Sequence, residues 1–273
     1  FQHKLKEVVS NHYQTKVKKS LLLSGGSDSS LLAFLSKQNK QNIITASSSK
    51  KFEKIPFNTL PKIKKNLKLK TDKYKHRVEE FLPNLTKFIE MTGFAIPWTA
   101  SVPLFILCGF AKKLKSRIVI TGEGADEIMS GYYSNFNLLN KRGAYNIHHV
   151  LKLNKNSLNY KNKFHKHIKK IFFYKKYLYK KLKFIKNKKD LEYKVNNLVD
   201  IKFYLQKNAL ISSDSYSMNN SLELRAPYLY LDFVKFVLNL SKEDMILEKR
   251  RITKLIHKRV ANKLIGNYFF EDK

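Results

Sequence analysis

The sequence contains very little cysteine, and it has no long apolar run. A single cysteine, Cys108, among 273 residues excludes an internal disulfide and fits a reducing compartment such as the cytoplasm. No apolar run is long enough to span a bilayer, and no segment has the charged, apolar and small-residue regions of a signal peptide. These absences exclude disulfide-stapled secreted proteins and membrane-spanning proteins.

Acidic residues are also scarce, since 21 Asp and Glu stand against 54 Lys and Arg, for a formal net charge of +33. Such a charge fits a partner that is nucleic acid or an anionic membrane surface. However, Lys far outnumbers Arg, Asn, Ile, Phe and Tyr are abundant, and glycine and proline are few. That combination indicates a whole-genome codon bias, and we therefore expect neither a nucleic acid nor a membrane partner.

Two of the nine glycines stand together where a strand is expected to end. Residues 21–23 are three leucines, which predict the end of a buried strand, and residues 31–35 open a helix. Glycine lets the backbone come close to a ligand, hydroxyls can bind it, and a helix N-terminus attracts anions. The loop between strand and helix supplies these groups in Ser24, Gly25, Gly26, Ser29 and Ser30. It predicts a phosphate cradle, and a plain strand–turn–helix connection without a ligand is the alternative.

The order of patterns along the chain predicts an α/β protein. Phe1–Lys19 has helical spacing of apolar residues, residues 43–47 and 117–121 are β-branched strands, and residues 81–91 and 104–114 are helical. Residues 50–69 are interrupted by prolines and give no clear pattern. We therefore expect a parallel sheet flanked by helices. Because ligands gather at the carboxyl ends of parallel strands, the glycine loops after the first strand and after residue 121 should open on the same edge.

The later half of the chain is expected to be mostly helical, including residues 200–213, 217–240 and 253–265. Within it, residues 152–189 contain fifteen lysines and no acid, interleaved with aromatic residues. Lysines and aromatics together can bind single-stranded RNA. We favour the alternative, a solvated helical insertion with one aromatic face against the core.

Three motifs, in the same order, resemble those of one family. Ser24-Gly25-Gly26-Ser27-Asp28-Ser29 matches the loop of the PP-loop ATP pyrophosphatases, which differs from a Walker motif. Thr121-Gly122-Glu123-Gly124-Ala125-Asp126-Glu127 is similar to the signature of the synthetase domain of asparagine synthetase. Residues 217–229, with Leu222-Glu223-Leu224-Arg225-Ala226-Pro227, resemble the third motif of that family.

The resemblance implies a PP-loop/HUP-like fold of the adenine nucleotide alpha hydrolase type and an ATP-dependent amide-forming ligase of EC 6.3.5 type. A carboxylate, aspartate in the family, is adenylated, and ammonia then displaces AMP. The domain expected is a single one, with an α/β core (1–140), a Lys-rich helical insertion (141–198) and a helical completion of the site (199–273).

The resemblance also assigns roles to residues. Asp28 and Asp126 would hold Mg²⁺ on the phosphates, since carboxylates bridge this ion to ATP, although either could be a plain helix N-cap. Glu123 would help ammonia lose a proton. Leu23, Thr121 and Gly122 would contact the nucleotide together with the loop residues. Supporting or substrate contacts are expected from Glu127, Glu223 and Arg225, for which a structural contact between helix and sheet is an equal alternative.

The family also uses a lysine near the end of the domain. Lys273 stands at the matching distance, although Glu271 replaces the family's arginine beside it, and Lys254 and Lys258 match a second basic patch. Because lysine is so abundant, a chance match is an open alternative at each of these positions.

The sequence departs from the family in two places. No glutaminase domain is represented, so ammonia would come from glutamine through such a domain elsewhere, and the start at Phe1 suggests a fragment. The family's Asp-Glu-Pro loop is Ala95-Ile96-Pro97 here, which leaves aspartate, a sugar or another carboxylate open as acceptor. The partners expected are thus a small-molecule carboxylate, ammonia and a second copy of the chain. Rival functions are a PP-loop tRNA-modifying enzyme and a non-catalytic descendant.

Overall fold

The computed structural model describes residues 1–39, 41–47, 59–93, 100–132 and 158–270. The chain divides into two compact units. The sheet unit comprises Phe1–Gly124, Asn208–Phe233 and Ile256–Lys273, and the helical unit comprises Ala125–Lys207 and Val234–Leu255.

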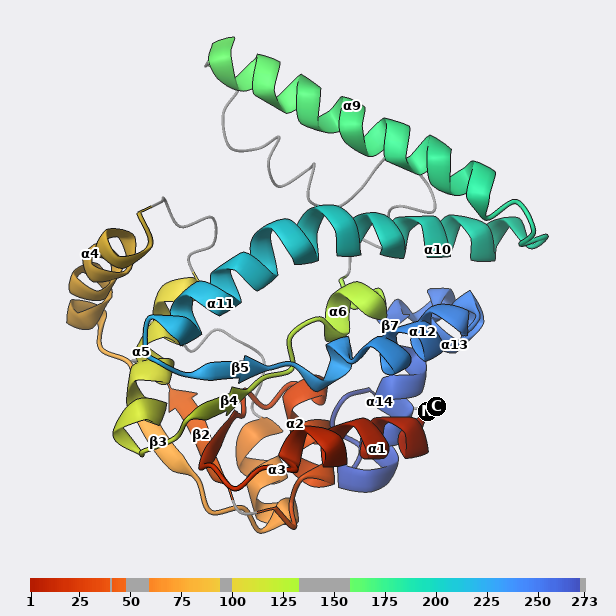
Figure 1. Ribbon diagram of the computed structural model, residues 1–273. Helices are drawn as coiled ribbons and strands as arrows, with labels where there is room; N and C mark the ends of the chain where they lie inside the picture. Colours follow the sequence, from red (N-terminus) through yellow and green to blue (C-terminus); the bar gives the residue numbers. More distant parts are fainter. Residues whose placement is uncertain (40, 48–58, 94–99, 133–157, 271–273) are drawn as a thin grey trace. The chain divides into compact units, whose positions relative to one another are not determined.

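The sheet unit is built on five parallel strands in the order β3-β2-β1-β4-β5 (Figure 1). The strands are β1 (Lys19–Leu22), β2 (Asn42–Ser47), β3 (Asp72–Lys75), β4 (Ile118–Ile120) and β5 (Glu223–Arg225). β1 is buried along its whole length, with Leu21 beside Ile43 on one neighbour and Ile120 on the other. The predicted parallel α/β fold is confirmed.

The strand order has one reversal. From β1 the chain moves outward to β2 and β3, and it then returns to the other side of β1 for β4 and β5. A ligand site is expected where the direction reverses, outside the carboxyl ends of the two strands involved. In this sheet that place lies between β1 and β4, which precede the two glycine loops.

Helices cover the sheet. They are α1 (Gln2–Tyr13), α2 (Ser27–Leu35), α3 (Thr59–Leu67), α4 (Phe81–Thr92), α5 (Ser101–Lys113), α11 (Leu210–Met218) and α14 (Leu255–Ile265), with short 3-10 turns η2 (Val78–Glu80) and η4 (Pro227–Leu229). α5 packs against α4 and α11, and their cluster with the sheet includes Phe88, Phe105, Cys108 and Tyr216. Cys108 is fully buried, as expected of a small apolar residue.

Two segments of the sheet unit differ from what their sequence patterns indicated. Residues 59–67 form α3 although no pattern was expected there, because Pro61 lies in the first turn, where a missing N–H does no harm. Residues 217–240 are not continuously helical, because residues 223–225 pair with β4 as a strand. Pairing with a neighbouring strand decided this segment, rather than its apolar spacing.

The helical unit contains α6 (Ala125–Ile128), α9 (Leu158–Lys181), α10 (Lys188–Asp200), most of the π-helix η3 (Ile201–Ala209) and of α12 (Leu231–Asn239), and α13 (Lys242–Met245). A small antiparallel pair, β6 (Ile246–Leu247) and β7 (Ile252–Thr253), flanks the turn η5 (Glu248–Arg250). α9 and α10 run side by side (Figure 1) and join through Ile171, Leu178, Val195 and Val199. Among the described residues, no helix is both long and apolar enough to cross a membrane.

The expected aromatic face of the Lys-rich segment is not buried. Phe172, Phe173 and Phe184 are each more than 60% exposed, and aliphatic residues make the contact with α10 instead. Of the aromatics, Tyr174 is partly buried and packs against Phe203. The helix predicted for this segment is present from residue 158, and residues 141–157 of the predicted insertion lie outside the described residues.

Candidate functional site

The loop after β1 is shaped by contacts of its main chain. Leu23, just past β1, is buried and donates its N–H to Ile44 O at 2.9 Å. Gly25 has φ +88°, and a Cβ there would lie 3.0 Å from Leu60 Cβ at the start of α3. Thr59 Oγ1 also donates to Gly25 O at 3.1 Å. Both the backbone angle and the close approach of α3 therefore require glycine at this position.

The serines of the loop gather at the N-terminus of α2. Ser24 N donates to Ser29 Oγ at 3.2 Å, and the two hydroxyls lie 2.9 Å apart. Ser30 Oγ is buried without a hydrogen-bond partner among the described residues. α2 begins after Gly26 with no side chain capping its first turn. Hydroxyls and the first-turn N–H groups of a helix suit the phosphates of ATP.

The loop after β4 meets the first loop. A Cβ on Gly122 would lie 3.1 Å from Asp28 Cβ and 3.5 Å from Ser29 N. Thr121 N donates to Arg225 O at 3.1 Å, while Thr121 Oγ1 is buried without a hydrogen-bond partner in the described part of the chain. The expectation that these two loops lie together at one sheet edge is confirmed.

Glu123 faces a buried tyrosine. Tyr216 of α11 donates its hydroxyl to Glu123 Oε2 at 3.3 Å. Burial and the neighbouring Glu123 raise the pKa of Tyr216 well above its ordinary value, so the phenol stays protonated as a donor. Glu123 itself is only partly buried. Its carboxylate is thus oriented by a buried donor at a partly exposed position.

Asp28 is held by two fully buried residues that the sequence patterns did not single out. Tyr228 OH donates to Asp28 O at 3.0 Å, and it lies 2.8 Å from His257 Nε2. His257 Nε2 is in turn 3.6 Å from Asp28 Oδ1. Tyr228 belongs to the quoted third motif without an assigned role, and a lone histidine in a basic helix carries no spacing that could have revealed it.

The helical unit contains the rest of the second motif. Asp126 Oδ1 forms an ion pair with the buried Lys254 Nζ at 2.7 Å, and a Cβ on Gly131 would overlap that carboxylate. Glu127 is buried and accepts a hydrogen bond from Tyr132, whose pKa is raised by burial and by Glu127. Lys254, expected in a basic patch, thus has a defined partner.

The residue types present fit Mg²⁺-ATP. Among the described residues no group of three or more His, Cys, Asp and Glu could hold a metal alone. Mg²⁺ with nucleotides, however, commonly uses one or two carboxylates plus phosphate oxygens. Asp28 lies beside the serine hydroxyls in the sheet unit, and Asp126 belongs to the helical unit. The pairing of these two aspartates at one ion stays a prediction.

Arg225 connects two elements of the sheet unit. Its Nε donates to Glu223 Oε1 at 2.7 Å, and its Nη1 donates to His12 O of α1, also at 2.7 Å. The side chain of Glu223 is 59% exposed. A supporting contact is therefore present for both residues. Lys273 and residues 95–97 lie outside the described residues.

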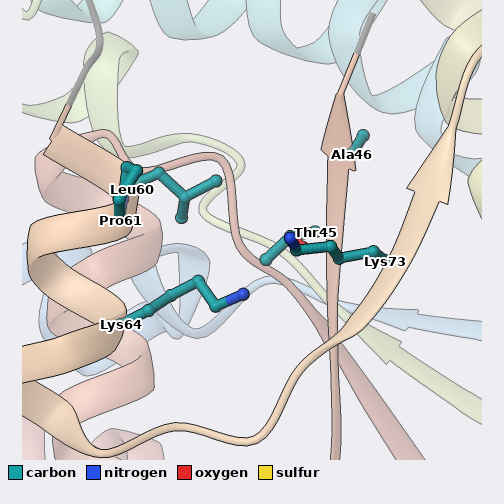
Figure 2. A pocket seen from close by; sticks show the side chains of 6 residues that line it. All are labelled: Thr45, Ala46, Leu60, Pro61, Lys64 and Lys73. Carbon is teal, nitrogen blue, oxygen red and sulfur yellow. The ribbon is translucent and has the colours of Figure 1, made fainter.

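A cavity of about 390 Å³ opens beside the loop, at the carboxyl end of β2. Figure 2 shows Lys64 of α3 and Lys73 of β3 reaching toward each other across it. Burial and then the charge of Lys73 lower the pKa of Lys64. The remaining lining is Thr45, Ala46, Leu60 and Pro61. Because residues 50–69 gave no pattern, sequence reasoning missed this cavity.

Comparison with known proteins identifies relatives of the chain. The family model described as Asparagine synthase matches residues 1–272. Proteins of Mycobacterium bovis and Mycobacterium tuberculosis, provisionally named asparagine synthetase (glutamine-hydrolyzing), are 28% identical over 131 residues. That match covers 47% of this chain and 20% of those proteins. The chain therefore spans well under two thirds of the length of these relatives.

A solved structure is also similar. It is the U34-tRNA thiolase NcsA from Methanococcus maripaludis with its 4Fe–4S cluster, at 13% identity and a TM-score of 0.32. The alignment covers 100% of this chain and 89% of that one.

Proposed function

The chain belongs to the asparagine synthase family, an ATP-using family, and on that premise we propose that it is an amide-forming ligase. A substrate carboxylate attacks the α-phosphorus of ATP, and the bond to the β-phosphate breaks to release pyrophosphate. Ammonia then attacks the acyl carbon of the acyl-adenylate. The carbon–oxygen bond breaks, AMP leaves, and one proton passes to a base, so that an amide is formed.

The observation that carries the proposal is the contact between the two loops. With 3.1 Å between Asp28 Cβ and the position of a Cβ on Gly122, no side chain separates the phosphate cradle from the loop that carries Glu123. Phosphates held at the first loop and a reacting acyl group beside Glu123 would therefore be within one substrate length of each other. Positioning of this kind accounts for much of the acceleration in two-substrate reactions.

The cradle would bind the pyrophosphate part of ATP. The hydroxyls of Ser24, Ser29 and Ser30 and the first-turn N–H groups of α2 are donors for phosphate oxygens. Asp28 would hold Mg²⁺, with Asp126 as the second proposed ligand. Mg²⁺ supplies neutralisation of the phosphate charge when it is bound.

Glu123 would accept the proton that ammonia loses as the amide forms. The hydrogen bond from Tyr216 orients the carboxylate of Glu123, and a carboxylate is a suitable base for this proton. A protonated, buried donor is suited to this role because it orients the carboxylate without removing its charge.

The cavity beside the loop would take the nucleoside end of ATP. Leu60 and Ala46 offer apolar contact, and the ammonium groups of Lys64 and Lys73 can donate to acceptor atoms of base or ribose. Because the chain belongs to the asparagine synthase family, aspartate is the favoured acceptor of ammonia, and a sugar or another carboxylate is the alternative. Ammonia would come from glutamine, hydrolysed by a glutaminase domain.

A pyrophosphate exchange assay tests the proposal. With Mg²⁺, ATP and labelled pyrophosphate, we expect exchange that depends on one member of a carboxylate panel led by aspartate. Asp28→Ala should abolish the exchange, whereas Glu79→Ala, at an exposed carboxylate of the same unit, should retain it. If none of the carboxylates in the panel supports exchange, the proposed adenylation is refuted. If Asp28→Ala keeps full activity, the proposed metal role of Asp28 is refuted.

A further inference from the structure

The helix α9 has two faces of different chemistry. Ile171 and Leu178 point toward α10, and Lys175 donates to Asn196 of that helix at 3.0 Å. The opposite face carries aromatic side chains, each 40–65% exposed, at positions Phe172, Phe173, Tyr177 and Tyr179. It also carries the exposed lysines Lys169, Lys170, Lys176, Lys180 and Lys181. We call these nine side chains the α9 outer face.

Rings and charges are interleaved on the α9 outer face. At 100° per residue, Lys169, Lys176 and Lys180 form one central row along the helix. Phe172 and Tyr179 flank the row on one side, and Phe173 and Tyr177 flank it on the other. The residues span about 18 Å of helix at 1.5 Å per residue. Lys181 Nζ lies 5.8 Å from the centre of the Tyr177 ring, so cation and ring are already neighbours.

No carboxylate belongs to this face. The sequence has no Asp or Glu between residues 152 and 189. Two acids of α10 act on α9: Asp200 is buried beside Lys175, and Glu192 acts on Tyr179 and Lys175. The five lysines of the outer face therefore give it a strong positive charge, which Glu192 of α10 opposes near Tyr179.

We propose that the α9 outer face binds single-stranded nucleic acid. Ammonium groups pair with backbone phosphates, and exposed rings offer surfaces on which unpaired bases stack. An anionic membrane fits less well, because a helix that lies in a bilayer surface separates its apolar side from its charges, whereas here the two alternate. For this segment the favoured alternative to RNA binding was a helical insertion with one aromatic face against the core, and the exposure of these rings removes that alternative.

Binding of a labelled oligouridylate of about 12 nucleotides by the full chain tests the proposal, since single-strand sites are about 4–16 nucleotides long. Fluorescence anisotropy should show saturable binding that weakens as salt rises. A plot of the logarithm of the binding constant against the logarithm of the salt concentration should have a slope of about −2 to −3.5 if three to five phosphates are contacted. Phe172→Ala with Phe173→Ala should weaken binding about tenfold or more. Lys176→Gln with Lys180→Gln should weaken binding and make its dependence on salt less steep, because fewer phosphates are contacted.

Two matched double variants serve as controls. Lys87→Gln with Lys113→Gln removes the same charge from exposed helical lysines of the sheet unit, and Leu82→Ala with Ile89→Ala removes exposed apolar side chains of α4. Both should bind as the unchanged protein does. Phe172→Leu with Phe173→Leu keeps apolar bulk but removes the rings, and it should also weaken binding, which separates stacking from misfolding.

Four results would overturn the proposal. The first is that the unchanged protein does not bind the oligonucleotide, and the second is that the α9 variants and their controls lose the same amount of affinity for it. The third is that the unchanged protein binds a fully paired duplex with equal affinity. The fourth is that the α9 variants lose binding to phosphatidylserine vesicles but keep binding to the oligonucleotide. None of these measurements requires ligase activity, so they stand apart from the test of the proposed reaction.

Discussion

The sheet unit and the helical unit hold the motif residues that each contains by different means. In the sheet unit the glycines make close contacts: a Cβ on Gly122 would lie 3.1 Å from Asp28 Cβ of the other loop, and one on Gly124 would lie 2.1 Å from Leu229 Cδ2 of η4. In the helical unit the second motif is held by charged side chains, with Asp126 paired to Lys254 and Glu127 bonded to Tyr132.

Burial shows the same contrast. Among the described residues, the sheet unit buries mostly Ser and Thr hydroxyls, and Lys19 is its buried lysine, with Nζ donating to main-chain oxygens. The helical unit buries Glu127, Asp200, Lys242 and Lys254. Steric fit is insensitive to pH, whereas buried charges depend on their protonation. The two units should therefore respond to different perturbations.

The largest effect is expected from Gly124→Ala. Gly124 has φ +82°, and an added Cβ would lie 2.1 Å from Leu229 Cδ2. Strain in the backbone and overlap with Leu229 together should cost about 3 kcal/mol or more of unfolding free energy, measured by urea denaturation. Gly93→Ala, with φ +70° and open space around it, should cost only about 1 kcal/mol. Equal losses in the two variants would show that steric fit does not hold this loop.

The next effect is expected from Asp200→Asn in the helical unit. Burial raises the pKa of Asp200 to about 7, and Lys175 opposes the shift. Between an unfolded pKa of about 3.9 and the folded value, the folded chain binds more protons, so stability falls as pH rises and levels off above pH 7. The variant should remove this fall and be more stable than the parent by about 2–4 kcal/mol at pH 8.

Hydrogen exchange of α10 amides at pH 5 and pH 8 would measure the Asp200 effect locally. Asp232→Asn, at an exposed carboxylate of the sheet unit, is the control and should leave the difference between the two pH values unchanged. If α10 is equally protected at both pH values in the parent, buried charge does not distinguish this unit.

The contrast between the units also explains what could be predicted from sequence. The loops at residues 24–30 and 121–124 were identified because glycines and small residues after strands are uncommon and have a physical reason to be there. The roles of Asp28 and Glu123, by contrast, were assigned from the resemblance to the family, and they stay predictions. The contacts that hold them could not, because Tyr216, Tyr228 and His257 reach the loops from more than 90 residues away in sequence.

The misassigned segments failed for physical reasons too. Pro61 suggested a break in regular structure, yet it occupies the first turn of α3, where proline is tolerated. The aromatic residues of α9 suggested a buried face, yet α10 is met by aliphatic side chains. In both segments the residue types suggested one structure, whereas the position of those residues within the helix determined the structure that forms.

Tyr228→Phe should have a moderate effect. It removes the part-buried hydrogen bond to Asp28 O and the buried contact with His257, and it should cost about 1–2 kcal/mol. Because Asp28 carries the proposed Mg²⁺ contact, the KM for ATP in pyrophosphate exchange should rise more than kcat falls. Tyr230→Phe, at an exposed ring two residues away, is the matched control. A stability loss without any change in KM would limit Tyr228 to a structural role.

The smallest effect is expected at Glu223. It compares an exposed ion pair with the part-buried hydrogen bond from Arg225 to His12 O. Glu223 is 59% exposed, so Glu223→Gln should change the unfolding free energy by less than about 1 kcal/mol. Arg225→Gln should cost more, because it also removes the donor to His12 O that joins α1 to β5. Urea denaturation of both variants and of the double variant gives the coupling between them. If Glu223→Gln costs as much as Arg225→Gln, then the ion pair, rather than the main-chain contact, holds this edge of the sheet unit.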